Sequence, residues 1–228
     1  MVPWLNPEDP FPPVERALRE PNGLLCAGAE LSVARLLEAY RGGIFPWYSG
    51  GEPVLWWSPD PRMVLVCEEL KVPRSLAKSI RNKGYEVRID TIFGQVLKGC
   101  SSRAQGTWLG KEMQACYLAL HRAGHAHCFE TWRGADLVGG LYGVAIGRMF
   151  YGESMFSRAT DASKVALYNL VQFLKARGFP LIDCQMRTRL LASLGAREIP
   201  RRVFLRQMAA LVNYREAPGK WTIRVTAE

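Results

Sequence analysis

Phe150-Tyr151-Gly152-Glu153-Ser154-Met155-Phe156-Ser157 and Leu181-Ile182-Asp183-Cys184-Gln185 are two short apolar segments, rich in aromatic or β-branched residues, that end in polar groups. Segments of this kind are typical of buried β-strands. Because α/β proteins place their chemistry at strand ends, these two would gather Glu153, Ser154 and an Asp-x-Gln pair beside an apolar wall. The alternative interpretation is two core strands with ordinary polar ends.

Composition changes along the chain at about residue 62. The first sixty residues are crowded with proline and tryptophan, and they hold one clear helix that Ser32 can cap and Gly42-Gly43 can end. From Met63 onward, strands are predicted at 63–67, 85–89, 128–132, 136–145, 149–155 and 181–185, and helices at 74–83, 112–123, 161–177 and 203–212. This pattern predicts an α+β fold with a mixed sheet, divided into a small N-terminal domain (1–62) and a larger domain (63–228).

The bulk composition indicates a globular protein that attracts polyanions. Hydrophobic residues make up 48% and charged residues 22% of the chain, as in soluble proteins. The net charge of +9 predicts a nucleic-acid partner, with a merely basic soluble protein as the alternative. The N-terminus lacks the basic start and apolar run of a signal peptide, and no stretch is as long as a membrane span. We therefore expect a cytoplasmic protein without membrane association.

The sequence contains no metal or cofactor motif. Its six cysteines are scattered without a C-x-x-C pair, which argues against a zinc ribbon and a disulfide framework. His121 and His125 have the spacing of a helical metal pair, but Gly124 interrupts the helix, so a turn before a strand is favoured. Neither a Walker loop nor G-x-G-x-x-G occurs. We expect no metal, no cofactor, and a substrate that arrives already activated.

One predicted helix carries a basic stripe. Arg74, Lys78 and Arg81 share one face, while Leu76 and Ile80 lie on the opposite one. Like charges at this spacing destabilise an isolated helix by a few tenths of a kcal/mol, so an anionic partner explains the stripe better than chance. A second basic cluster contains Arg197, Arg201, Arg202 and Arg206. A solvated surface face is the alternative for that cluster.

Longer blocks of the sequence resemble one known family. In chain order they are Leu18-Arg19-Glu20-Pro21-Asn22-Gly23-Leu24-Leu25, Gly43-Ile44-Phe45-Pro46-Trp47, Trp56-Trp57-Ser58-Pro59-Asp60-Pro61-Arg62, Gly106-Thr107-Trp108, Gly124-His125-Ala126-His127, Gly152-Glu153-Ser154-Met155-Phe156-Ser157, Ile182-Asp183-Cys184-Gln185, Ala192-Ser193-Leu194-Gly195-Ala196 and Ile199-Pro200-Arg201-Arg202. Together they resemble the leucyl/phenylalanyl-tRNA–protein transferases, from about Leu18 to Arg202. Blocks of this length, in order over nearly the whole chain, make the resemblance specific.

The resemblance implies both a reaction and a fold. Members of the family move Leu or Phe from aminoacyl-tRNA to a protein whose N-terminus is Arg or Lys, which creates a degradation signal in the bacterial N-degron pathway. Their C-terminal domain has a GNAT-like, acetyltransferase-type fold, which here would be residues 63–228. We expect Leu and Phe to be used well as donors and Met weakly, and we expect a monomer.

The resemblance also implies roles for particular residues. Asp183 and Gln185 are the implied catalytic pair, and Trp47 and Trp108 would stack near the terminal adenosine of the tRNA. The implied wall of the donor side-chain pocket is Leu141, Phe150, Met155, Leu167 and Ile182. To the substrate-binding residues we add Tyr117, Glu153 and Ser154, and as tRNA-binding residues we expect Arg74, Lys78, Arg81, Arg201 and Arg202. The sequence departs from the family at Leu190, where a His is usual, and at Leu141, where Met can occur.

The implied chemistry agrees with the residues. Aminoacyl-tRNA is an activated ester, and the acceptor α-amine, with a pKa near 7.7–8.0, is about one-tenth neutral at pH 7. The enzyme must align the two groups and remove one proton. We expect Gln185 Oε1 to hold the amine and Asp183 to orient Gln185 and offset the positive charge, with Glu153 or Asp183 facing the cationic acceptor.

Two other classes of protein remain open from the sequence. An acyl-CoA acetyltransferase could share the fold, but its [RQ]-x-x-G-x-[GA] loop is missing from this chain. A noncatalytic RNA-binding protein would share the basic charge, and a turnover assay separates it from an aminoacyltransferase.

Overall fold

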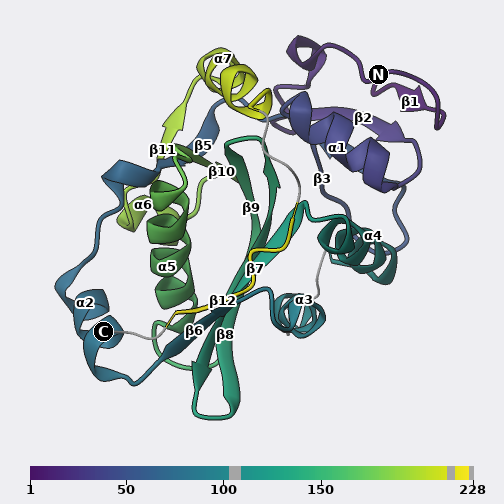
Figure 1. Cartoon of the computed structure of the whole chain (residues 1–228). Coiled ribbons are helices and arrows are strands. Elements are labelled where there is room, and N and C mark those ends of the chain that lie inside the picture. Colours follow the sequence, from purple (N-terminus) through teal and green to yellow (C-terminus); the bar gives the residue numbers. More distant parts are fainter. Residues whose placement is uncertain (103–108, 215–218, 226–228) are drawn as a thin grey trace.

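The computed structural model describes residues 1–102, 109–214 and 219–225, which form two β-sheets and their covering helices (Figure 1). The N-terminal sheet consists of β1 (Trp4–Leu5), β2 (Leu24–Gly28), β3 (Phe45–Pro46) and β4 (Leu55–Trp57), in the order β1-β2-β4-β3. A 3₁₀ turn, η1 (Val14–Arg16), and a helix, α1 (Val33–Arg41), accompany it.

The start and end of α1 agree with the sequence signals. Ser32 caps the helix, because its side chain accepts a hydrogen bond from the backbone N–H of Arg35 at 3.1 Å. Leu36, Ala39 and Tyr40 form the buried face. Gly43 then turns the chain with φ of 72°, a backbone conformation that glycine adopts without strain, and a Cβ there would lie 2.5 Å from the Leu205 side chain.

The larger sheet contains eight strands with helices on both faces. Its strands are β5 (Arg62–Val66), β6 (Glu86–Ile89), β7 (Ala126–Arg133), β8 (Asp136–Ile146), β9 (Met149–Ser157), β10 (Leu181–Gln185), β11 (Arg197–Ile199) and β12 (Ile223–Val225). Its helices are α2 (Arg74–Asn82), α3 (Phe93–Ser101), α4 (Lys111–Arg122), α5 (Ala162–Ala176), α6 (Arg189–Ser193) and α7 (Arg201–Val212), with a 3₁₀ turn, η2, at Cys67–Glu69. The strand order is β11-β5-β10-β9-β8-β7-β6-β12.

Figure 1 shows α5 on one face of this sheet and α3 and α4 on the other. The predicted α+β class and mixed sheet are confirmed. Each strand and helix predicted after Met63 is present, with boundaries that move by up to two residues. The helix α3 was not predicted, because Gly94 and Gly99 lower helix propensity. Gly99 is needed there, since a Cβ would lie 2.6 Å from the ring of Phe156.

The strands β9 and β10 form the one parallel pair among the described strands of the larger sheet. They pair from Leu181 opposite Met149 to Asp183 opposite Tyr151, and β9 then continues without β10 to Ser157. Two irregularities lie where the strands part. Glu153 has no partner between the pairs that β9 makes with β8, and Cys184 has none between the pairs that β10 makes with β5. Bulges of this kind redirect side chains next to functional sites.

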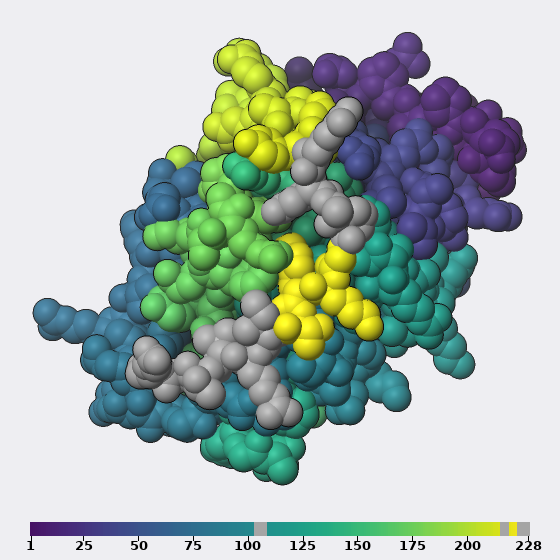
Figure 2. All heavy atoms as spheres, viewed as in Figure 1, coloured from purple at the N-terminus to yellow at the C-terminus, as the bar shows by residue number. Residues whose placement is uncertain are grey.

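The N-terminal sheet and the larger sheet share one hydrophobic core. A single cluster contains Trp56 and Tyr40 from the N-terminal segment together with Tyr151 and Phe204. Figure 2 shows the purple N-terminal segment at one corner of the molecule, beside the yellow-green α7. The division into domains at residues 1–62 and 63–228 stays a prediction.

Candidate active site

A cavity of about 440 Å³ opens where β9 and β10 part. One wall is apolar and comes from β8, β9, α5, β10 and α6, and the other end is polar. The lining residues are Pro46, Trp47, Leu141, Tyr142, Gly152, Glu153, Ser154, Met155, Leu167, Leu170, Ile182, Cys184, Gln185, Met186, Thr188, Leu190 and Leu191. The two segments singled out in the sequence therefore face one common space.

Gln185 is held in an unusual backbone conformation at the polar end of the cavity. Its φ is 62°, in the left-handed region that side-chain-bearing residues rarely adopt. Its backbone N–H donates to Asp183 Oδ1 at 2.9 Å, and its Nε2 donates to Glu153 Oε1 at 2.9 Å. A conformation of this kind costs on the order of 1–3 kcal/mol and persists only where the surroundings impose it. The two hydrogen bonds fix the direction of the amide, and they leave Oε1 as its accepting atom.

Asp183 lies behind the cavity in a buried ion pair. The Arg62 Nε and Nη2 atoms donate to its two carboxylate oxygens at 2.8 and 2.6 Å, and both side chains are 0% exposed. Arg62 Nη1 also donates to the carbonyl of Gly43 at 3.1 Å, and its guanidinium lies 4.9 and 4.7 Å from the ring centroids of Phe45 and Phe204. Arg62 therefore already balances the charge of Asp183, and this carboxylate, one of the two considered for the acceptor, does not line the cavity.

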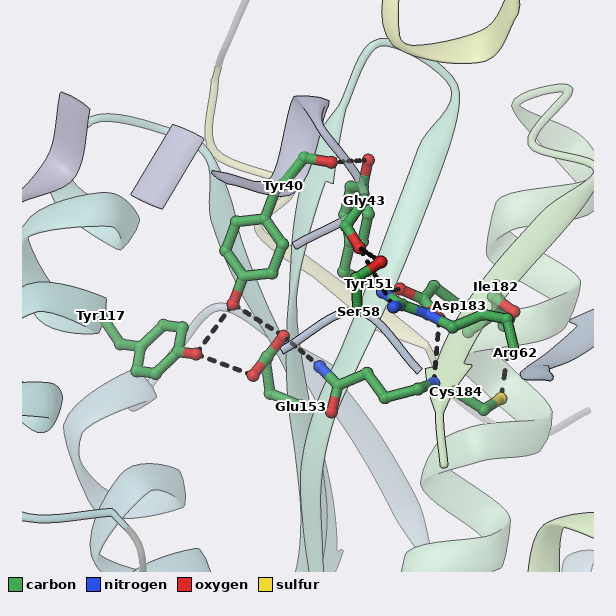
Figure 3. A network of polar contacts seen from close by, with 11 residues as sticks. Tyr40, Gly43, Ser58, Arg62, Tyr117, Tyr151, Glu153, Ile182, Asp183 and Cys184 are labelled. Carbon is green, nitrogen blue, oxygen red and sulfur yellow. Dashed lines mark hydrogen bonds and ion pairs between the residues drawn. The ribbon is translucent and has the colours of Figure 1, made fainter. Parts of the chain in front are cut away.

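Glu153, the other carboxyl group considered for the acceptor, does line the cavity. Tyr40 of α1 donates to its Oε1 at 2.8 Å, and Tyr117 of α4 donates to its Oε2 at 2.7 Å (Figure 3). Burial raises the pKa of Glu153 to about 7, while the hydrogen bonds from Tyr117 and Tyr40 act in the lowering direction. Burial and the nearby carboxylate also hold the pKa values of both tyrosines well above their usual range.

The structure brings most of the predicted substrate-binding residues together. Seven of them line the cavity: Trp47, Leu141, Glu153, Ser154, Met155, Leu167 and Ile182. Tyr117 is buried and reaches the cavity only through Glu153. Phe150 does not line it, because its ring is fully buried and packs against Trp221 at a centroid distance of 6.1 Å. Trp108 lies outside the described residues.

Several residues of the site were not predicted from the sequence. Arg62 and Tyr40 make direct contacts with the predicted polar residues, and Leu170, Met186, Leu190 and Leu191 extend the apolar wall. Leu190 stands where the resembling family usually has a His, so the wall is apolar at that position. The sequence did contain a signal for Leu190 and Leu191. Thr188 caps α6 with its side chain, and a threonine shortly before an apolar pair is typical of the start of a helix.

The predicted tRNA-binding residues occupy two surfaces. Arg74, Lys78 and Arg81 are exposed on α2, with Leu76 buried and Ile80 half-buried behind them. Arg202 is exposed at the start of α7. Arg201 is half-buried, its Nη1 donates to the carbonyl of Ser58, and its backbone N–H donates to Asp60 at 2.9 Å. Its guanidinium therefore holds the N-terminal segment against α7.

The described residues contain neither a cluster of metal ligands nor a helix suited to crossing a membrane. Across residues 1–102, 109–214 and 219–225, no group of three or more His, Cys, Asp and Glu side chains is placed to hold a metal ion. In the same part of the chain, no helix combines the length and the apolar character that crossing a bilayer requires.

A cavity with an apolar wall and a polar end formed by an amide and a carboxyl group is typical of an enzyme that transfers a group carrying an apolar moiety. Comparisons with known proteins specify which one. The family model for leucyl/phenylalanyl-tRNA protein transferase matches residues 64–209, and the model for the N-terminal domain of that transferase matches residues 29–60. The chain belongs to this family of tRNA-dependent aminoacyltransferases that act on protein N-termini, as the sequence blocks predicted.

Individual relatives agree over nearly the full length. The chain is 57% identical over 224 residues to the leucyl/phenylalanyl-tRNA–protein transferase of Chromobacterium violaceum, which covers 97% of the chain and 96% of the relative. It is 60% identical over 215 residues to that of Thiobacillus denitrificans, with 93% and 94% covered. Among solved structures, it is similar to a GCN5-related N-acetyltransferase from Kribbella flavida, with a TM-score of 0.40, 11% identity, and 71% and 58% of the two chains covered.

Proposed function

We propose that this chain transfers leucine or phenylalanine from aminoacyl-tRNA to proteins whose N-terminus is Arg or Lys, and so marks those proteins for degradation. The observation that carries the proposal is that an apolar wall leads directly to Gln185 and Glu153 within one cavity. An apolar wall suits the donor side chain, and the polar end suits the two reacting groups. Family membership supports the same reaction.

The apolar wall accounts for the choice of donor. Leu141, Met155, Leu167 and Ile182 offer only hydrocarbon and thioether surface, and Met155 can adapt to either Leu or Phe. A charged donor side chain would lose its hydration without gaining a partner there. Met would be used weakly, and β-branched donors would fit poorly by shape. Trp47, which is 38% exposed at the cavity, offers a face on which the terminal adenosine can stack.

The polar end accounts for the acceptor. Gln185 Oε1 can accept a hydrogen bond from the α-amine, because Nε2 is already committed to Glu153. Asp183 positions Gln185 through the backbone N–H and does not touch the substrate. Among the described residues, Glu153 is the one carboxyl group that lines the cavity, so it is the group that faces a cationic N-terminus. The amine attacks the ester carbonyl, and the carbon–oxygen bond to the ribose breaks.

The tRNA would be held by charge outside the cavity. The exposed stripe of Arg74, Lys78 and Arg81 and the exposed Arg202 can contact phosphates, whereas Arg201 is engaged with the N-terminal segment. We place the reaction in the cytoplasm, where charged tRNA and nascent proteins occur. We expect a monomer to suffice, because the amide, the carboxyl group and the apolar wall all come from one chain.

The test is transfer of labelled leucine from Leu-tRNA to a model protein that begins with Arg, with no ATP and no added metal. The same protein beginning with Glu serves as the matched acceptor control. Label on the Arg-initiated protein alone supports the proposal. No transfer from Leu-tRNA or Phe-tRNA by a folded sample at low salt refutes it, and equal labelling of both acceptors refutes the acceptor preference.

A further inference from the structure

Three oxygen-bearing groups at the polar end of the cavity touch one another in a closed ring. The Tyr40 and Tyr117 hydroxyl oxygens are 2.8 Å apart, Tyr40 is 2.8 Å from Glu153 Oε1, and Tyr117 is 2.7 Å from Glu153 Oε2. Each of these three contacts needs one hydrogen atom to be a hydrogen bond. The two phenols supply two. The ring therefore has room for a third proton, which only the carboxyl group of Glu153 can carry.

The ring can hold either two or three protons without moving its heavy atoms. With Glu153 ionised, both phenols donate to the carboxylate, and the contact between the two tyrosines holds no hydrogen. With Glu153 protonated, its O–H donates to one phenol, that phenol donates to the other, and the second donates to the remaining carboxyl oxygen. Gln185 Nε2 can donate to Oε1 in both states, because oxygen has two lone pairs.

The surroundings of Glu153 hold these two states close in free energy. Burial is the largest influence on the pKa of Glu153 and raises it, and the charge of Asp183 acts in the same direction. The hydrogen bonds from Tyr117 and Tyr40 and the charge of Arg62 lower it. The resulting pKa is about 7. The two phenols stay protonated throughout this range. An acceptor α-ammonium has a pKa near 7.7–8.0, so proton transfer between it and Glu153 is nearly balanced.

We propose that Glu153 is the catalytic base that takes the proton from the acceptor's α-ammonium, and that Tyr40 and Tyr117 are positioning residues that make room for it. This inference rests on the proposed function. One N–H bond of the ammonium breaks and one O–H bond forms on Glu153, which leaves a neutral amine hydrogen-bonded to Gln185. The amine lone pair then attacks the ester carbonyl, and a second amine proton leaves with the departing ribose oxygen. Glu153 finally returns its proton to water.

Two contacts hold the ring in place. Tyr151 donates to the backbone carbonyl of Tyr40 at 2.8 Å, which fixes α1 against β9 (Figure 3). The ring of Tyr117 packs edge-on against Tyr142 at a centroid distance of 5.1 Å. Glu153 itself lies at the bulge of β9, so its side chain turns toward the ring, out of line with its neighbours on the strand.

The experiment measures kcat/KM for an Arg-initiated acceptor against pH, with Leu-tRNA as donor, for the wild type and for Glu153→Gln. Glutamine keeps the size of the side chain but cannot take up a proton. The acid-side fall of the wild type should have its midpoint at about 7, and that of the variant should move to the pKa of the free amine. When each profile is normalised to its own value above about pH 8.5, where the amine is already neutral, the variant should be about fivefold below the wild type near pH 6.5.

Two tyrosine variants separate positioning from general structure. Tyr117→Phe removes a hydrogen bond that lowers the pKa of Glu153, so the acid-side midpoint should rise. Tyr85→Phe is the matched control, because Tyr85 is also buried and donates one hydrogen bond, to Thr160, away from the cavity. Its midpoint should stay at the wild-type value. Melting curves establish that each variant is folded.

The outcomes distinguish this inference from the proposed function. Absence of transfer by the wild type at every pH refutes both. Wild-type transfer combined with an unchanged midpoint in Glu153→Gln, or with the same fold loss at every pH, refutes the assignment of Glu153 as the base and leaves the proposed function standing. An acceptor that ends in an aminooxy group, which is neutral at pH 7, gives a second readout. The wild type and Glu153→Gln should use it equally, and a persistent deficit would contradict the proposal.

Discussion

Alanine at Asp183 is expected to lower both stability and activity, because this carboxylate is one half of a fully buried ion pair. Arg62 and Asp183 are both 0% exposed, and their contacts measure 2.8 and 2.6 Å. Removing one partner of such a pair leaves the other charge buried and unpaired, which costs about 3–5 kcal/mol of folding free energy. For a chain of this length, that loss lowers the melting temperature by about 6–20 °C.

Alanine at Gln185 should separate activity from stability. Its side chain lies at the cavity and makes one hydrogen bond to Glu153, so the loss of folding free energy should be about 1 kcal/mol. Both variants should lower turnover by at least about tenfold to a hundredfold, since Gln185→Ala removes and Asp183→Ala misplaces the amide that we propose holds the amine. Binding of tRNA should change little, because neither residue lies on the basic surfaces.

The assay combines thermal melts by circular dichroism with single-turnover transfer. Glu198→Ala is the control, because its ion pair with Arg187 is 3.5 Å long and exposed, and such pairs contribute at most about 1 kcal/mol. A double variant, Arg62→Met with Asp183→Leu, removes both charges and should melt above Asp183→Ala. The reasoning is refuted if Asp183→Ala melts within about 2 °C of the wild type, or if Gln185→Ala loses as much stability as Asp183→Ala.

Replacing Arg74, Lys78 and Arg81 together by alanine should weaken binding of unrelated tRNAs alike and reduce the slope of log K against log salt by about 0.7–0.9 per lost contact, as read by filter binding; an unchanged slope would show that this stripe faces solvent. Met155→Ala should impair transfer of Leu more than of Phe in a competition assay, because the smaller donor leaves the larger void, and equal losses would contradict this. The folded-state pKa of Glu153, about 7, lies above its unfolded value. The free energy of unfolding, measured relative to Glu153→Gln, should therefore be highest below the unfolded pKa of Glu153 and should decline as pH rises through about 7. Profiles of the two proteins that stay parallel over pH would refute the raised pKa.

Periodicity in the sequence was sufficient for the long elements of the larger sheet. The apolar stripe of α5 and the nearly continuous apolar run of β8 are strong local signals, and both elements were predicted close to their observed bounds. The short pieces β11 and β12 were missed, because three residues carry no period and each exists only through its partner strand. The helix α3 was missed because its glycines suit packing against Phe156 at the expense of local propensity.

Only some residues of the candidate site could be predicted from the sequence. Strand ends pointed to Glu153, Asp183 and Gln185, since polar residues after apolar runs are a local pattern. Arg62 could not be placed in this way, because arginine is rarely buried and its partner Asp183 is 121 residues away. For the same reason the sequence left both Glu153 and Asp183 open as the carboxyl group that meets the acceptor, whereas of these two Glu153 lines the cavity. Which carboxyl group meets the cavity is decided by tertiary pairing, not by the strand that carries it.

The ion pair of Arg62 and Asp183 also explains why the site lies where the two sheets meet. Gly43 receives hydrogen bonds from Arg62 and Ser58 at 3.1 Å, so the segment that leads to Trp47 is fixed to the same guanidinium that holds Asp183. Through Asp183, that guanidinium also fixes Gln185 in its left-handed conformation. A shift of the N-terminal segment would therefore be transmitted to the amide that holds the amine, because the contacts form one continuous buried chain. Under the proposed function, this one support would align the donor's adenosine with the acceptor's amine, and alignment of the two reactants is what an already activated ester most requires of its enzyme.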